Sequence, residues 1–60
     1  MPLTTKELSS LEEQLGLEQN LVQKYTAMAA ALTDPALKNK CKSIARKHQK
    51  HFDKLYGYLN

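Results

Sequence analysis

The chain has 60 residues, a single cysteine and a formal net charge of +3, and 42% of its residues are hydrophobic. A chain of this length forms at most one small domain, which buries only about 60% of the surface of its unfolded form, so a metal or a partner chain is expected to stabilise it. Cys41 is the only cysteine and cannot form an internal disulfide. So low a cysteine count is typical of a protein in a reducing, intracellular compartment. No apolar run reaches the roughly 18 residues of a membrane span.

A first helix is predicted from about residue 5 to about residue 32. Thr4 and Glu7 have the spacing of a capping box, in which each side chain pairs with the backbone N–H of the other residue. Gly16 carries no loop signal, and we interpret it as a packing notch for the ring of Phe52. Residues at steps of three and four form a seam typical of packed antiparallel helices: Leu8, Leu11, Leu15, Glu18, Val22, Tyr25, Ala29 and Leu32.

A turn is predicted at residues 33–35 and a second helix from Pro35 to about residue 58. Asp34 is a good N-cap, and Pro35 suits the first helical position because no amide hydrogen is needed there. We expect Gly57 to be the point at which this helix frays. The seam predicted for the second helix consists of Leu37, Cys41, Ile44, His48, His51, Leu55 and Tyr58.

So short a turn forces the two helices antiparallel, so the fold class is all-α, a two-helix hairpin. Each hairpin leaves the flanks of its apolar seams uncovered, so we expect it to pair with a second copy into a four-helix bundle. The predicted partner is therefore a second identical chain, in a homodimer or a larger homo-oligomer.

Three ionisable residues interrupt the two seams at one level of the hairpin. The turn is centred near residue 34, so the residue numbers of two facing residues should add up to about 68. This relation places Glu18 opposite His48 and His51. Two imidazoles three residues apart share a helix face, and with a carboxylate they suit a divalent transition metal such as Zn, Fe or Mn. Two alternatives stay open: a hydrogen-bonded polar layer that fixes the helix register, or histidines at the edge of the seam with their tips in water.

The charge is divided between the two halves of the chain. Residues 1–34 hold two bases and five acids, whereas residues 35–60 hold seven bases and one acid. One reading of this basic half is a phosphate-binding face for nucleic acid, a weaker alternative than a solvated face paired with Glu12 and Glu13. No catalytic triad, phosphate-binding loop or dinucleotide fingerprint is present, so metal-centred redox chemistry is the one enzymatic activity with support. The basic face consists of five residues spaced four apart on the second helix, Lys38, Lys42, Arg46, Lys50 and Lys54, with Lys40 and Lys47 beside them.

Seven short runs within about residues 11–59 form a recognisable set: Leu17-Glu18-Gln19, Lys24-Tyr25, Asp34-Pro35-Ala36-Leu37-Lys38, Ile44-Ala45, His48-Gln49-Lys50-His51-Phe52, Leu55-Tyr56 and Tyr58-Leu59. This part of the chain resembles the coat F domain, which is found in spore coat proteins of endospore-forming bacteria. That domain looks like a divergent branch of the ferritin-like superfamily, which includes rubrerythrin.

The resemblance implies a small structural or interaction protein, located in the spore coat and in contact with other coat proteins. It alternatively implies a ferritin-like metal-binding or redox protein. Glu18 and His51 match the first-helix glutamate and the histidine of a ferritin-like metal half, but His48 stands where that pattern has a second glutamate. Loss of one carboxylate makes the site less anionic, which favours a divalent ion or an empty site over a pair of higher-valent ions.

Overall fold

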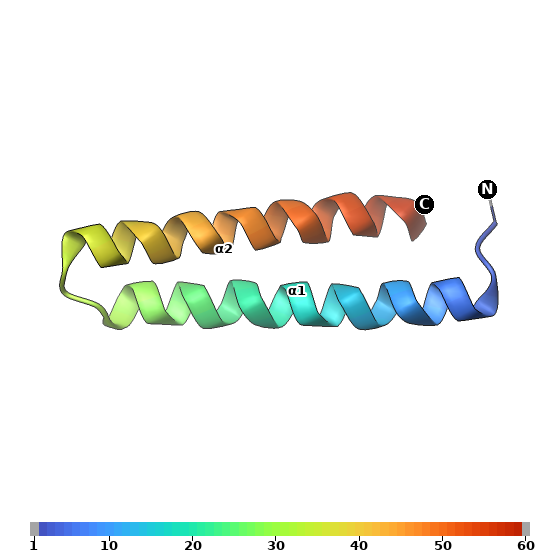
Figure 1. Cartoon of the computed structure of the whole chain (residues 1–60), viewed down its shortest axis with the longest axis horizontal. Coiled ribbons are helices and arrows are strands. Elements are labelled where there is room, and N and C mark those ends of the chain that lie inside the picture. Colours follow the sequence, from blue (N-terminus) through green and yellow to red (C-terminus); the bar gives the residue numbers. More distant parts are fainter. Residues whose placement is uncertain (1, 60) are drawn as a thin grey trace.

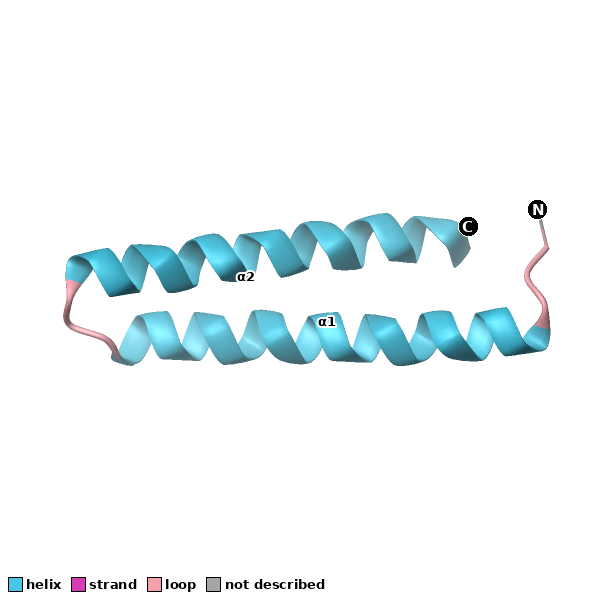
Figure 2. Cartoon of the chain, viewed as in Figure 1, coloured by secondary structure: helices cyan, strands magenta, loops and turns pink. Residues whose placement is uncertain are grey.

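The computed structural model describes residues 2–59, and this part of the chain is all-helical, without a strand. Helix α1 runs from Thr5 to Ala31, helix α2 from Pro35 to Tyr56, and a single 3-10 turn, η1, from Gly57 to Leu59. The two helices lie side by side and run in opposite directions (Figure 1), joined by one short loop (Figure 2). The rod measures 46 × 14 × 11 Å. The all-α hairpin expected from the sequence is confirmed.

Local hydrogen bonds fix where α1 begins. The Thr4 hydroxyl accepts from the backbone N–H of Glu7 at 3.1 Å, and the backbone N–H of Thr4 donates to Glu7 Oε1 at 2.9 Å. This second hydrogen bond is the main reason that the pKa of Glu7 is below its usual value. The capping box satisfies two N–H groups that would otherwise lack a partner at the helix end.

The turn is fixed by equally local chemistry. Leu32 follows α1 with extended backbone (φ −79°, ψ 144°), and its N–H donates to the carbonyl of Met28 at 3.1 Å. Asp34 is the N-cap of α2, and its Oδ1 accepts from the backbone N–H of Leu37 at 2.9 Å. Pro35 occupies the first position of α2, where no amide hydrogen is required.

The seam predicted on α2 is wrong at alternate positions. Leu37 is 55% exposed and Tyr58 is 62% exposed, whereas Ala45 is buried and Phe52 is half-buried. Steps of three and four place Ile44 on the predicted seam, although Ile44 is only half-buried. Small residues lie between the helices because they let the two backbones approach closely. The buried apolar residues are accordingly Leu15, Ala29, Cys41 and Ala45.

The notch predicted at Gly16 is also absent. Gly16 is exposed, and a Cβ atom built on it would meet nothing within 4 Å. Gly16 and Leu15 differ by about 100° around the helix axis, and Leu15 is the one that is buried. The ring of Phe52 stacks instead on Tyr56, with their centroids 5.9 Å apart.

The hairpin leaves much apolar surface in water. Within the described range, no large side chain is less than 2% exposed. Neither helix in that range combines the length and the apolar character that a membrane crossing requires. Eight large apolar or aromatic side chains are classed as exposed: Leu3, Leu8, Leu17, Met28, Leu37, Tyr56, Tyr58 and Leu59.

Candidate metal centre

Glu18 is the one charged residue that the described hairpin buries. It lies in the middle of α1 on the face toward α2, and it is 7% exposed. One turn earlier on the same face, Gln14 donates a hydrogen bond from Nε2 to Glu18 Oε2 at 3.3 Å. Sequence reasoning missed Gln14, although its position four residues before Glu18 was a usable signal.

His48 makes the shortest contact with this carboxylate. Its Nδ1 lies 2.6 Å from Glu18 Oε1, and its side chain is 24% exposed. An ionised carboxylate only accepts hydrogen bonds, so Nδ1 carries the hydrogen that is donated to Glu18. The imidazole stacks on the ring of Tyr25, with centroids 6.2 Å apart and planes 16° apart. The hydrogen bond and the stacking together restrict the orientation of the ring, so the edge position considered for His48 is excluded.

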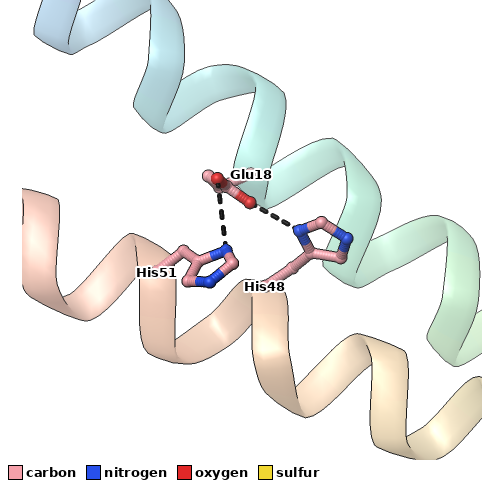
Figure 3. Close-up of side chains that lie close together, drawn as sticks. All are labelled: Glu18, His48 and His51. Carbon is pink, nitrogen blue, oxygen red and sulfur yellow. Dashed lines mark hydrogen bonds and ion pairs between the residues drawn. The ribbon is translucent and has the colours of Figure 1, made fainter.

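His51 approaches the same carboxylate from the rim of the interface. Its Nδ1 lies 3.6 Å from Glu18 Oε2, and its side chain is 59% exposed. The rings of His48 and His51 are nearly perpendicular, at 84°, with centroids 5.7 Å apart. Figure 3 shows both imidazoles turning a nitrogen from α2 toward the two oxygens of Glu18 on α1. The expectation that the three side chains converge agrees with this geometry, although His51 lies at the edge of the seam and not inside it.

The surroundings keep Glu18 ionised. The hydrogen bond from His48 is the main reason that the pKa of Glu18 lies below its ordinary value of 4.5; burial acts in the opposite direction. The hydrogen bond from Gln14 and the nearby imidazoles lower this pKa further. At neutral pH the site therefore presents a carboxylate, which is the form that binds a metal.

The donor set suits one divalent transition metal. One ligand atom from each of Glu18, His48 and His51 can be chosen so that all three lie within 4.8 Å of one another. Imidazole nitrogen and carboxylate oxygen bind Zn²⁺ at about 2.0–2.2 Å, and ligands in a tetrahedral site then lie about 3.4 Å apart. The 3.6 Å contact between His51 Nδ1 and Glu18 Oε2 is close to that separation. The 2.6 Å contact of His48 is a hydrogen bond, so an ion bound at Nδ1 would have to replace the hydrogen that this nitrogen carries. Two imidazoles and one carboxylate also leave coordination positions open for water or another ligand.

A ferritin-like dinuclear centre does not fit a single hairpin. Such a centre needs a second carboxylate where this chain has His48, and no other acidic residue of the described range joins the cluster. The geometry is therefore that of a mononuclear set with three protein donors.

Comparison with known proteins does not place this chain in a family: no family model, no curated protein and no solved structure matches it. The resemblance to coat F domains thus stays a prediction from the residues quoted above.

Proposed function

We propose that this protein is a small homo-oligomeric helical bundle that binds a divalent transition metal through Glu18, His48 and His51. The observation that carries the proposal is the convergence of one buried carboxylate and two imidazoles, from two different helices, with ligand atoms within 4.8 Å. Zn, Fe and Mn are the metals that this mixture of oxygen and nitrogen donors suits.

The position of His51 favours a metal over a purely structural polar layer. At 3.6 Å, its Nδ1 is too far from Glu18 Oε2 for a good hydrogen bond, and it is not hydrogen-bonded to any described residue. The same separation is close to the distance between two ligands of one ion. A layer that only fixed the helix register would gain from closing this contact, whereas a bound ion would hold the two atoms apart.

Self-association is the second part of the proposal. Among residues 2–59 no large side chain is fully buried, so the hairpin has a weak core of its own. Its exposed leucines, methionine and tyrosines would be covered by a second hairpin. In a two-fold four-helix bundle each copy contributes its own Glu and two His, so the assembly carries two sets of ligands. The apolar surface left exposed by one chain supports this arrangement.

A structural role of the kind that the coat F resemblance implies is compatible with the same assembly. In that role the bundle interacts with other coat proteins, and the metal stabilises it without turning over a substrate. Expression confined to sporulating cells is the outcome expected for this role; constitutive expression during vegetative growth would argue against it.

Titration of Zn²⁺ into untagged protein, followed by calorimetry at pH 7, tests the metal proposal. We expect saturable binding in the wild-type protein that His48→Ala and His51→Ala each weaken by at least tenfold. Gln49→Ala, a change between the two histidines on the exposed side of α2, is the matched control and should leave affinity unchanged. Equal affinity in all four proteins would contradict the assignment of the ligands.

A further inference from the structure

Charge in this hairpin is divided along its long axis. Residues 19–50, which form the end of the rod that contains the turn, hold seven bases and one acid, a formal charge of +6. The rest of the described chain, at the open end, holds two bases and five acids, a formal charge of −3. The bases of the turn end are Lys24, Lys38, Lys40, Lys42, Arg46, Lys47 and Lys50.

Acidic side chains do not neutralise the turn end. Its single acid, Asp34, uses Oδ1 to cap α2 through the backbone N–H of Leu37. Glu18, at the border of this segment, is engaged by the two histidines, and within residues 2–59 no lysine or arginine forms an ion pair. The acidic side chains Glu12 and Glu13, expected from the sequence to pair with the basic face, form no such bridge.

Three of these cations line one hollow between the helices. Lys38, Lys42 and Arg46 follow each other at one-turn intervals along α2, about 6 Å apart along its axis. The other lining residues have small side chains, which leave room for a ligand to approach the helices: Thr26, Ala29, Ala30 and Ala45. The hollow is separate from the candidate metal centre, because Lys42 and His51 point about 180° apart around α2.

We propose that the turn end binds a chain of phosphates, the backbone of a nucleic acid, with Lys38, Lys42 and Arg46 as its principal contacts. Regularly spaced cations suit a regularly charged polymer, whose affinity comes from release of its counterions. The hollow presents no aromatic side chain on which a base could stack, so binding is independent of sequence. An anionic membrane is a poorer partner, because the lining offers no large apolar side chain for insertion. This inference does not depend on the metal.

A salt series with matched charge variants tests the proposal. The probe is a fluorescein-labelled 20-base-pair duplex of mixed sequence, and its anisotropy is followed from 50 to 200 mM salt. With three phosphate contacts, the logarithm of the binding constant should fall with the logarithm of the salt concentration at a slope of about −2.7. Over this range of salt the affinity then falls by about 40-fold. Lys42→Gln with Arg46→Gln should lower affinity at 50 mM by at least tenfold and reduce the slope to about −0.9.

The control variant, Lys6→Gln with Lys54→Gln, removes the same net charge from the open end of the rod and should leave affinity within about twofold. Circular dichroism of both variants verifies that the helices are retained. Inorganic polyphosphate should displace the duplex, since both offer the same phosphate chemistry. The proposal is overturned by absence of binding at 50 mM salt, by equal losses in the two variants, or by failure of polyphosphate to compete.

Discussion

Replacing His51 by alanine should separate a metal centre from a polar layer. In the presence of a chelator the change costs little, because the imidazole is 59% exposed and lies 3.6 Å from the carboxylate. Exposed ion pairs of this kind contribute little to the free energy of unfolding. The melting temperature of His51→Ala in chelator should therefore be less than about 4 °C below that of the wild-type protein. The metal-bound state behaves differently, because His51 then supplies one of three protein ligands.

The size of the metal effect follows from mass action. Free Zn²⁺ at 100 times its dissociation constant stabilises the folded protein by about 2.7 kcal/mol. In a domain of this size each kcal/mol shifts the melting temperature by about 4–8 °C, so the wild-type protein should gain about 11–22 °C. His51→Ala should lose most of that gain, while the neighbouring exposed change Lys47→Ala should keep it.

The assay is thermal unfolding followed by circular dichroism, with Zn²⁺ or with chelator, at one fixed protein concentration because the protein is expected to associate. Two outcomes would refute the reasoning. A wild-type protein that gains no stability from Zn²⁺ has no metal centre, and an equal gain in His51→Ala removes His51 from it.

Three further predictions concern stability and assembly. Gly16→Ala should stabilise the protein by about 1 kcal/mol in denaturant titrations, because the added methyl group enters open space and alanine favours the helix; a loss would show that a partner packs against Gly16. In the presence of chelator, the lowered pKa of Glu18 stabilises the folded protein fully above pH 4.5, and this stabilisation is progressively lost below that pH. Glu18→Gln should therefore reduce the fall in melting temperature between about pH 5 and 3. A fall as steep as that of the wild-type protein would contradict this prediction. Light scattering at micromolar concentration should give a mass of at least two chains, and a stable folded monomer would defeat the proposed bundle.

The parts of the fold that depend on local chemistry could be predicted from the sequence. The capping box of Thr4 and Glu7 and the cap that Asp34 gives to α2 each involve residues three positions apart, so their spacing alone identifies them. The level at which Glu18 meets the histidines followed from counting residues across so short a turn.

The rotation of α2 about its axis could not be predicted in the same way. Residues on one face of a helix follow each other at steps of either three or four, because a turn has 3.6 residues. At every second step two neighbouring residues can therefore occupy the seam, such as Ile44 or Ala45. The predicted seam contains Ile44 and His51, whereas the structure buries Ala45 and half-buries Phe52, the next residue in each case. The same rotation moves His51 to the rim and leaves His48 between the helices.

Metal content measured by elemental analysis tests the central claim most directly. Untagged protein loaded with Zn²⁺ and freed of excess metal should hold about one ion per chain, and dialysis against chelator should remove it. The double variant His48→Ala with His51→Ala should hold almost none after the same treatment. Wild-type protein that retains no ion, or a double variant that retains as much as the wild type, would contradict a metal centre built from Glu18, His48 and His51.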